Sequence, residues 1–325
     1  MDTKGIKRIG VLTSGGDAPG MNAAIRAVVK TAYGYGIETL GIRRGYNGLI
    51  NGDVVELDAK GVENLITKGG TMLYTARCEE FRTPEGVKKG ANSCKYLGID
   101  GLVTIGGDGT FRGALDLSRE GISTVGVPAT IDNDIACTHY SIGFDTACNT
   151  ALDAVDKLRD TMQSHERCSV VEVMGRHAGH LALYVGVASG AIAILVPEKP
   201  LNFAMDVADK IRRGRIRGRT HYIIIVAEGV GNVTELAQRI EKETGMDTRV
   251  SILGHIQRGG KPSVRDRVSA SRMGSYAVTC LHQGKTNRVV CTINSEIIDL
   301  DIGEALCMKK GLLENTYNVA QILSL

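Results

Sequence analysis

The sequence predicts an α/β fold in which helices cover both faces of mainly parallel sheets. Short apolar runs rich in Val and Ile alternate with segments that repeat their apolar residues at helical spacing. The apolar runs are continuous rather than alternating, which is typical of strands buried on both faces. The chain has 325 residues, 43% of them hydrophobic. That length accommodates two domains of ~100–200 residues each.

The elements follow in order along the chain. Apolar runs predict strands at Arg8 to Thr13, Glu38 to Arg43, Gly101 to Ile105, Ser123 to Val127, Ser169 to Met174, Ala191 to Val196, Tyr222 to Ala227 and Val250 to Leu253. Helical periodicity predicts helices at Met21 to Tyr35, Phe111 to Arg119 and Asp145 to Gln163. In the first helix Ile25, Val28, Val29 and Ala32 share one face, as Leu152, Val155 and Leu158 do in the third.

Composition excludes several classes of protein. The eight cysteines include no CxxC pair, so we expect neither a zinc site nor a disulfide framework. The segment Met1 to Ile9 is too polar for a signal peptide, and no apolar run reaches the ~18 residues of a membrane span. We therefore expect a reduced, soluble, cytoplasmic protein without membrane partners.

Two glycine-rich turns each follow a predicted strand. Gly15-Gly16-Asp17 precedes the first helix, where free N–H groups can bind an anion, although an ordinary turn would look the same. In Gly106-Gly107-Asp108-Gly109-Thr110 the carboxylate could hold Mg²⁺ between phosphates or simply cap the next helix. The first turn matches neither GxGxxG nor GxxxxGK[ST], which disfavours dinucleotide-reductase and P-loop functions.

The segment Thr130-Ile131-Asp132-Asn133-Asp134 directly follows the apolar run that ends at Val127. Acidic groups at the carboxyl end of a strand lie where open α/β sheets bind ligands. One carboxylate can accept the proton of an attacking hydroxyl while the other organises the metal or the transferring group. The alternative is a solvated acidic turn, and the position after a buried strand disfavours it.

Several arginines lie near later strand ends. Three predicted strands end in candidate segments, namely Met174-Gly175-Arg176, Glu228-Gly229 and Gly254 to Gly260. Arg167 and Arg249 each precede one of these strands. Arginine binds phosphate through two parallel N–H groups, so this set predicts a sugar-phosphate site. Single arginines of this kind more often form surface salt bridges.

The run Arg212 to Arg219 is strongly basic. Such a run commonly forms a solvated helix end, and a small phosphorylated effector is the functional alternative that we favour. No aromatic residue is interleaved for base stacking, so we expect no nucleic-acid partner. His177 and His180 have metal-ligand spacing without an acid or Cys to complete a set, so we interpret them as structural.

The motifs, in this order, closely resemble the bacterial type of ATP-dependent 6-phosphofructokinase. The resemblance runs from Ile9 to about Gly284 and includes SGGDAPGMNAA, GGDGT, TIDNDI, VVEVMGR and LGHIQRGG. It implies two Rossmann-like, three-layer α/β/α domains with the active site in the cleft between them. The implied limits are 1–142 plus 256–306 for a larger ATP-binding domain and 143–255 plus 307–325 for a smaller fructose-6-phosphate-binding domain.

The implied reaction is transfer of the γ-phosphoryl of MgATP to the 1-hydroxyl of fructose 6-phosphate, a step of glycolysis. Asp132 would be the general base, and Asp108 would hold Mg²⁺. The implied catalytic set is Asp132, Arg176, Arg77, Thr130 and Asp134. The implied ATP set is Gly16, Arg77, Cys78, Gly107, Asp108, Gly109 and Thr110.

The resemblance also implies a substrate set and an effector set. The substrate set is Thr130, Ile131, Asp132, Arg167, Met174, Gly175, Arg176, Glu228, Arg249, His255, Ile256, Gln257 and Arg258. Arg167 and Arg249 would reach it from a neighbouring subunit, which implies a homotetramer. An effector, ADP or phosphoenolpyruvate, would meet Arg26, Lys30, Arg159, Gly190, Arg217, Arg219 and His221.

Four positions bear on the donor and the effectors. Pyrophosphate-dependent relatives tend to have Asp at the position of Gly109, so Gly109 favours ATP, whereas Ala129 departs from the usual Gly. Ala59 stands where an arginine is usual in the effector site, and Ile192 stands near where an acid or metal-binding partner is usual, which predicts weakened or altered allostery. The rivals are a pyrophosphate-dependent enzyme, a lipid or NAD kinase that shares GGDGT, a non-catalytic phosphate sensor and a basic nucleic-acid-binding module.

Overall fold

The structure is a computed structural model that describes residues 5–324. The chain folds into two compact units and passes between them more than once. The first unit contains the described residues up to Ile131, Ile135–Thr146 and Arg258–Lys310. The second contains Asp132–Asp134, Ala147–Gln257 and the chain from Gly311 onward.

The first unit is built on a seven-stranded sheet in the order β11-β10-β5-β4-β1-β2-β3. Its strands are β1 (Arg8–Thr13), β2 (Glu38–Ile42), β3 (Val54–Leu57), β4 (Gly101–Gly106), β5 (Ser123–Pro128), β10 (Arg288–Ile293) and β11 (Glu296–Asp301). The five inner strands run parallel, while β3 and β11 pair antiparallel at the two edges. The central strand β4 is buried at every position, as its continuous apolar run predicts.

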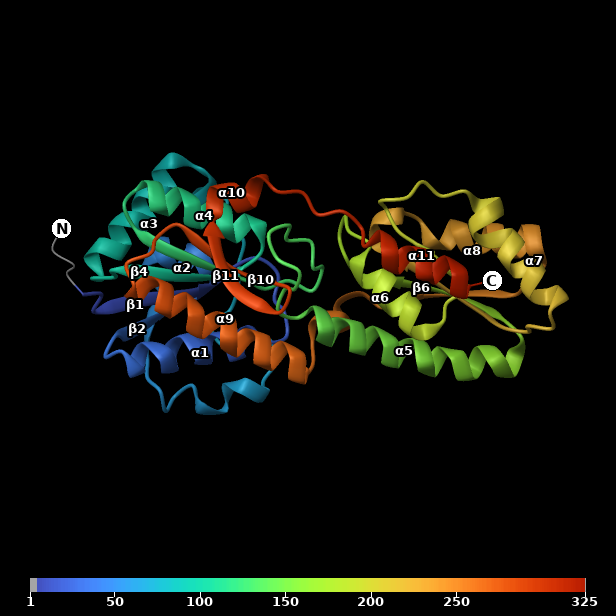
Figure 1. Cartoon of the computed structure of the whole chain (residues 1–325), viewed down its shortest axis with the longest axis horizontal. Helices are drawn as coiled ribbons and strands as arrows, with labels where there is room; N and C mark the ends of the chain where they lie inside the picture. The colour runs from blue at the N-terminus through green and yellow to red at the C-terminus, as the bar shows by residue number, and fades with distance from the viewer. Residues whose placement is uncertain (1–4, 325) are drawn as a thin grey trace. The chain divides into compact units, whose positions relative to one another are not determined.

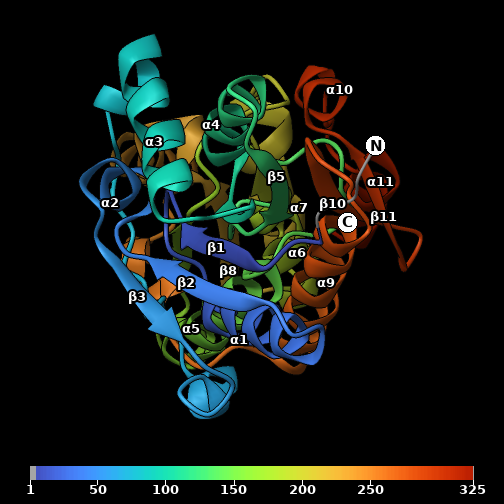
Figure 2. The same cartoon turned by 90° about the vertical axis from the view of Figure 1, so that its left-hand side faces the viewer.

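Helices cover both faces of this sheet (Figure 2). One face packs against α1 and α9, and the other packs against α4 with α2, α3 and α10 around it (Figure 1). These helices are α1 (Met21–Gly34), α2 (Gly45–Asn51), α3 (Pro84–Tyr96), α4 (Asp108–Arg119), α9 (Val264–His282) and α10 (Ile302–Cys307). The sheet and its two helical layers bury the core between them.

The second unit contains a parallel four-stranded sheet in the order β7-β8-β6-β9. Its strands are β6 (Cys168–Val173), β7 (Ala193–Leu195), β8 (Tyr222–Ala227) and β9 (Thr248–Ile252). Its helices are α6 (His180–Ser189), α7 (Asp209–Ile216), α8 (Val233–Thr244) and α11 (Glu314–Leu323), and the long α5 (Phe144–His165) enters it from the first unit. Short helical turns are η1 (Glu63–Thr67), η2 (Glu80–Arg82), η3 (Ala204–Ala208), η4 (Glu228–Val230) and η5 (Gly254–Arg258).

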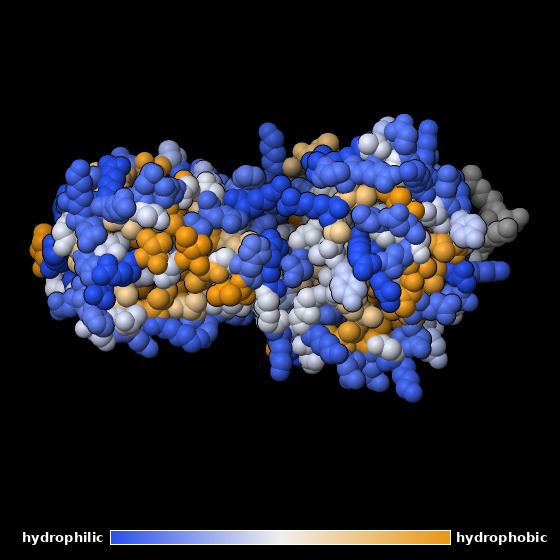
Figure 3. All heavy atoms as spheres, turned by 180° about the vertical axis from the view of Figure 1, so that it is seen from behind, coloured by the Kyte–Doolittle hydropathy of each residue, from blue (hydrophilic) through white to orange (hydrophobic). Residues whose placement is uncertain are grey.

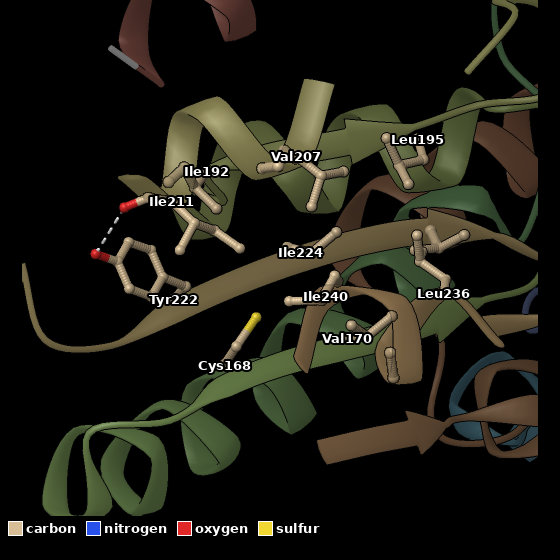
Figure 4. Close-up of a cluster of buried hydrophobic side chains, with 14 of the residues drawn as sticks. Cys168, Val170, Ile192, Leu195, Val207, Ile211, Tyr222, Ile224, Leu236 and Ile240 are labelled. Atoms are coloured by element: carbon tan, nitrogen blue, oxygen red, sulfur yellow. Dashed lines mark hydrogen bonds between the residues drawn. The ribbon is translucent and has the colours of Figure 1, made fainter. Parts of the chain in front are cut away.

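An aliphatic cluster joins β6 and β8 to the helices on one face of this sheet. Val170 and Ile224 meet Ile240 of α8 and neighbouring apolar side chains of η3 and α7 (Figure 4). Tyr222 is the polar exception, and its hydroxyl donates to the carbonyl oxygen of Ile211 at 3.2 Å. The buried Tyr222 hydroxyl is therefore satisfied, as a buried polar group must be.

The predicted fold class is confirmed, and the differences are three further strands, one of them the inner strand β10, and shifted element ends. The strands β3, β10 and β11 are not among the predicted ones. Edge strands carry polar side chains, and β11 reads EIIDLD, so the continuous apolar signal is weak there. The strand β9 begins at Thr248, so Arg249 lies inside it and does not precede it. The helix α4 begins at Asp108, three residues before the predicted start.

Among the described residues, none of the helices combines the length and the apolar character that crossing a bilayer requires.

Candidate active site

The carboxyl ends of three adjacent strands bring together, within the first unit, the two glycine turns and the chain that follows β5 as far as Ile131. The N–H of Ser14 donates to the carbonyl of Ile105 at 3.0 Å, which ties the end of β1 to the end of β4. The hydroxyl of Thr110 donates to the carbonyl of Ser14 at 3.1 Å. On the other side, the N–H of Ala129 donates to the carbonyl of Gly106 at 2.9 Å.

The start of α4 forms an open cradle of backbone. A Cβ placed on Gly107 or on Gly109 meets no atom within 4 Å. By contrast, a Cβ on Gly106 would come within 2.5 Å of the carbonyl oxygen of Ser14, so that glycine is needed for the two turns to approach. Free N–H groups at a helix start attract anions, and the open space over Gly107 and Gly109 leaves room for phosphate oxygens.

The segment that carries Arg77 and Cys78 lies against the first glycine turn. The hydroxyl of Thr13 donates to the carbonyl of Tyr74 at 2.8 Å, and the hydroxyl of Thr75 donates to the carbonyl of Gly15 at 2.6 Å. Two residues further on, Arg77 is exposed, and Cys78 packs partly buried against the apolar cluster beside β2. The predicted ATP residues Gly16, Arg77, Cys78 and Gly107 to Thr110 thus belong to one edge of one sheet.

Arg258 contacts the first glycine turn. Its Nη1 donates to the carbonyl of Asp17 at 3.0 Å, and a Cβ on Gly16 would lie 2.5 Å from the same nitrogen. The sequence grouped Arg258 with the sugar-phosphate residues and gave no sign of this contact. Sequence reasoning also missed Tyr46, whose hydroxyl donates to the carbonyl of Thr110 at 2.5 Å and fixes the start of α4 from below.

The segment from Thr130 to Asp134 is a buried loop. Asp132 is 7% exposed and Asn133 is 4% exposed. Asn133 has a φ of 50°, a left-handed conformation that asparagine tolerates better than most residues. The hydroxyl of Ser141 donates to the carbonyl of Thr130 at 2.8 Å and fixes the start of the loop. Burial of Asp132 does not fit a solvated acidic turn and fits a positioned functional carboxylate.

In the second unit, Glu228 organises the turn after β6. One carboxylate oxygen of Glu228 accepts from the N–H of Gly175 at 3.2 Å and from the N–H of Arg176 at 2.5 Å. Gly175 has a φ of 142°, and a Cβ there would come within 2.4 Å of the carbonyl of Ala178, so the turn requires glycine. The result is an exposed Arg176 guanidinium on a fixed backbone.

Gln257 holds the other side of that turn. Its Oε1 accepts from the N–H of Met174 at 3.3 Å, and its Nε2 donates to the carbonyl of Gly254 at 3.0 Å. Gln257 is fully buried, whereas the neighbouring His255 and Ile256 are exposed. The carboxyl end of this sheet therefore brings together Met174, Gly175, Arg176, Glu228 and Gln257. His255 lies two residues before Gln257 in the sequence.

Arg167 and Arg249 lie at the opposite end of the same sheet, at the amino ends of β6 and β9. Both pair with Asp247: Arg167 Nε lies 2.5 Å and Arg249 Nη1 lies 2.7 Å from its carboxylate oxygens. Arg167 precedes the six-residue strand β6 and Arg176 follows it. Six residues of strand span roughly 20 Å. One copy of this sheet does not bring these two arginines to the turn of Met174 to Arg176.

The predicted effector residues divide between the two units. In the second unit, Arg159 Nη2 donates to the carbonyl of Ser189, next to Gly190. Burial lowers the pKa of His221, and the positive charges of Arg159 and Arg219 lower it further. A pocket of about 350 Å³ nearby is lined by Ile192, Lys210, Arg213, Gly214, Arg217, Gly218, Arg219 and Ser324.

Arg26 and Lys30 project from α1 of the first unit toward Glu63. Arg26 Nε donates to the carbonyl of Glu63 at 3.3 Å, and Lys30 Nζ lies 4.0 Å from its carboxylate. The spacing of four residues places both cations on one helix face. Both belong to the first unit, whereas Arg159, Arg219 and His221 belong to the second.

The donor set fits a magnesium ion shared with a phosphorylated ligand. Within residues 5–324, no cluster of three His, Cys, Asp or Glu side chains could hold a metal by itself. Mg²⁺ usually takes one or two carboxylates and completes its shell with water and substrate phosphates. Asp108, exposed beside the open glycine cradle, is a carboxylate of that kind.

Comparison with known proteins identifies the family. The family profile described as phosphofructokinase matches residues 8–281. Proteins named ATP-dependent 6-phosphofructokinase share 57% identity in Clostridium botulinum (strain Loch Maree / Type A3) and 54% in Clostridium novyi (strain NT). Each of these alignments covers 98% of this chain and all of the relative.

A solved structure agrees. The phosphofructokinase of Saccharomyces cerevisiae superimposes with a TM-score of 0.86 at 34% identity, covering 98% of this chain and 46% of the yeast chain. The chain thus spans about half the length of the yeast protein, whereas it spans the whole length of the clostridial relatives. The resemblance predicted from the five motifs is confirmed. The chain belongs to the phosphofructokinase family.

Proposed function

We propose that this chain is an ATP-dependent 6-phosphofructokinase. It transfers the γ-phosphoryl of MgATP to the 1-hydroxyl of fructose 6-phosphate and releases fructose 1,6-bisphosphate and ADP, a step of glycolysis. The observation that carries the proposal is 57% identity over 319 residues to a full-length relative of that name. Since both substrates are cytoplasmic metabolites, we expect the enzyme in the cytoplasm.

The first unit supplies the nucleotide side. The backbone of Gly107 to Thr110 and of Gly16 holds the phosphates, with Arg77 and Cys78 beside them. The open space over Gly107 and Gly109 supports this assignment, because side chains there would compete with the ligand. Asp108 would hold Mg²⁺ together with the phosphates. When bound, the ion neutralises charge on the β- and γ-phosphate oxygens.

The second unit supplies the sugar-phosphate side. The turn from Met174 to Arg176, fixed by Glu228 and Gln257, presents its N–H groups and the Arg176 guanidinium to fructose 6-phosphate. The remaining contacts come from Thr130, Ile131, Asp132, His255, Ile256 and Arg258. An arginine beside a fixed backbone suits phosphate, which it binds through two N–H groups.

Asp132 acts as the general base. Its carboxylate accepts the proton of the sugar 1-hydroxyl as the oxygen attacks the γ-phosphorus, and the bond from that phosphorus to the ADP oxygen breaks. Arg77 and Arg176 stabilise the charge that develops on the transferring group. Thr130 and Asp134 flank the base and orient the reacting groups. Phosphoryl transfer needs positioning and charge stabilisation rather than a covalent protein intermediate.

The enzyme acts as a homotetramer in which Arg167 and Arg249 complete the site of a neighbouring subunit. Both arginines lie at the opposite end of the sheet from Arg176, which supports this proposal. A second copy can bring to the site the arginines that lie far from it in one copy. Apolar side chains also gather at the surface of both units among charged ones (Figure 3), as at surfaces that meet a partner.

ADP or phosphoenolpyruvate binds at the basic effector residues of both units. Two positions should weaken or alter the response: Ala59 stands where an arginine is usual, and Ile192 stands near where an acid or metal-binding partner is usual. Ile192 lines the pocket of about 350 Å³ beside Arg217 and Arg219. Titration of each effector into fructose 6-phosphate saturation curves tests this part of the proposal. Strong, ordinary responses to both would contradict altered allostery.

A pyrophosphate-dependent reaction is the second candidate, because Ala129 departs from the usual glycine of ATP-dependent relatives. A coupled assay that compares ATP with pyrophosphate at equal fructose 6-phosphate separates the two reactions. We expect turnover with ATP and little with pyrophosphate. Turnover with pyrophosphate alone would assign the second reaction, and turnover with neither would refute both.

A further inference from the structure

Asp266, near the start of α9, is a buried carboxylate with an unusual number of donors. Its side chain is fully buried, and it lies outside every residue set assigned above. One oxygen accepts from the Tyr140 hydroxyl and from the N–H of Gly143 at 2.7 Å. The other accepts from the N–H of Thr146 at 2.8 Å and from its hydroxyl at 2.5 Å. These four donors come from one short segment, residues 140–146, and the hydroxyl of Ser263 adds a longer contact to the second oxygen at 3.5 Å.

The same segment opens the helix α5. Gly143 directly precedes its first residue, Phe144, and Thr146 lies in its first turn. A carboxylate that accepts N–H groups at a helix start satisfies donors that have no partner inside the helix. The hydroxyl of Thr146 also accepts from the N–H of Ser263 at 2.9 Å, which ties the starts of α5 and α9 to each other. Asp266 therefore fixes where α5 begins.

A stacked cation adds to this attachment. Burial raises the pKa of Asp266 above its ordinary value, and hydrogen bonds from Thr146, Tyr140 and Gly143 offset part of that rise. The guanidinium of Arg265 lies 4.3 Å from the centre of the Tyr140 ring, so a cation covers the aromatic donor. A carboxylate buried among several donors is costly to displace, since each donor would lose its partner.

The segment that Asp266 holds is the return limb of the loop that carries Asp132. The N–H of Ile142 donates to the carbonyl of Pro128 at 3.0 Å, and the hydroxyl of Ser141 donates to the carbonyl of Thr130 at 2.8 Å. A backbone bridge also pairs Ala129 with Ile142. The outgoing limb, from Pro128 to Thr130, therefore rests on the limb that Asp266 fixes.

We propose that Asp266 is a positioning residue for phosphoryl transfer, holding residues 140–146 so that Thr130 and Asp132 keep their place. The inference rests on the proposed function, because it assigns the general base to Asp132. Asp266 itself touches no reacting atom. It holds the return limb through Tyr140, Gly143 and Thr146. The return limb in turn holds the outgoing limb through Ser141 and Ile142.

A carboxylate at this place also contributes to stability, so the test must separate positioning from folding. Loss of the attachment shifts the loop, and a shift of ~1 Å in a catalytic group lowers turnover by about 100-fold. The ATP cradle at Gly107 and Gly109 is also held by hydrogen bonds between the ends of β1 and β4 that do not involve residues 140–146. A positioning role therefore lowers kcat while the KM for MgATP stays within about threefold.

Four variants carry the experiment: Asp266→Asn, Tyr140→Phe, Thr146→Val and its matched control Thr146→Ser. Asp266→Asn places an amide where Thr146 donates, Tyr140→Phe removes one donor, and Thr146→Ser keeps the hydroxyl that Thr146→Val removes. Turnover with ATP and fructose 6-phosphate is measured per folded subunit, well below the melting temperature. We expect kcat to fall about 10- to 100-fold in Asp266→Asn and about 3- to 10-fold in Thr146→Val. Thr146→Ser should stay within about twofold.

A double-mutant cycle with Asp132→Ser gives the decisive readout. If Asp266 acts through Asp132, then Asp266→Asn lowers the residual turnover of Asp132→Ser by less than about twofold. An equal fold-loss in both backgrounds would overturn the proposal, as would an unchanged kcat in the folded variants. Should Asp266→Asn fail to fold, Thr146→Val and Tyr140→Phe run in the same cycle. Absence of activity in the wild-type chain would instead refute the proposed function.

Discussion

The two units use different groups at the carboxyl ends of their strands. In the first unit the candidate site is formed by backbone at Gly107 and Gly109, where a Cβ would meet no atom within 4 Å. In the second unit side chains dominate, because Glu228 and Gln257 fix the turn that presents Arg176. Similar layered sheets therefore carry two kinds of proposed anion site.

The difference matches the two proposed substrates. A backbone cradle follows the chain of phosphates in a nucleotide, which needs many donors at close approach. A fixed arginine supported by a half-buried acid and a buried amide suits a single phosphate ester on a sugar. The comparison predicts that changes in the first unit alter the KM for MgATP, and that changes in the second alter the KM for fructose 6-phosphate.

The largest effect is expected at Asp132, the proposed general base. Asp132→Ser should lower kcat by roughly 10²–10⁴-fold, the loss expected for a positioned base. Steady-state assays with saturating ATP and fructose 6-phosphate measure this. Asp153→Asn, an exposed carboxylate of α5 that pairs with Lys157, serves as the control and should keep normal turnover. Near-normal turnover of Asp132→Ser would remove Asp132 from its role.

Glu228→Ala tests the second unit. The N–H groups of Gly175 and Arg176 lose their acceptor, and a hydrogen bond to a charged group contributes about 1.5–3 kcal/mol. The KM for fructose 6-phosphate should therefore rise about 10- to 100-fold. The KM for MgATP should stay within about twofold. Glu241→Ala, at an exposed site on α8, is the control. Equal changes in both KM values would break the division between the units.

Arg167→Ala tests whether a second copy completes the sugar-phosphate side. Loss of one arginine contact to phosphate should lower kcat/KM for fructose 6-phosphate by about tenfold or more. Hybrids of Arg167→Ala with Asp132→Ser subunits should then exceed the mean activity of their parents. Each Arg167→Ala subunit retains its own Asp132 and borrows Arg167 from its neighbour. Hybrids no better than that mean would place Arg167 outside any shared site.

Gly109→Asp adds a carboxylate to the backbone cradle of the first unit. Because a Cβ there meets nothing within 4 Å, the fold should tolerate the change. Repulsion between the new charge and the phosphates should raise the KM for MgATP about 5- to 10-fold at the effective dielectric of a surface site. Gly109→Asn has the same size without the charge and should cost less. Equal KM values in both variants would mean that size, not charge, governs the cradle.

The sequence predicted the strand ends well because chemistry and fold coincide there. GGDGT and TIDND follow buried strands, so the same residues mark where each strand ends and supply the candidate ligand-binding groups. The first helix was predicted at Met21 to Tyr35 and is found at Met21–Gly34 for a similar reason, its apolar face being continuous.

Long-range contacts were beyond the sequence. Arg258 and Asp17 are far apart along the chain, and no local pattern signals that the guanidinium donates to the Asp17 carbonyl. Asp266 reads as an ordinary charge in the first turn of α9, although it is buried under the loop that ends at Thr146. The edge strand β11 was missed because its acids weaken the apolar signal, and one of them, Asp299, is structural.

Asp299 supplies the smallest expected effect, on stability alone. Although burial raises its pKa, hydrogen bonds from Lys285, Tyr276 and Arg288 outweigh that and lower the pKa to about 2, from an ordinary 3.8. The carboxylate is only 7% exposed, so solvent screens the network little. A depressed folded pKa stabilises the fold at pH values above the unfolded pKa. That stability disappears as the pH falls from about 4 to 2.

Asp299→Asn should therefore lower the free energy of unfolding by about 2 kcal/mol at neutral pH. Urea titrations at pH 7, 5 and 3.5 should give a constant difference from wild type at the first two values and a smaller one at the third. Asp116→Asn, which breaks the exposed pair with Arg119, should cost less than about 0.5 kcal/mol. Both KM values should stay unchanged in Asp299→Asn, because β11 lies at the far edge of the sheet from β1 and its glycine turn. A change in either KM would extend the functional part of the first unit to that edge.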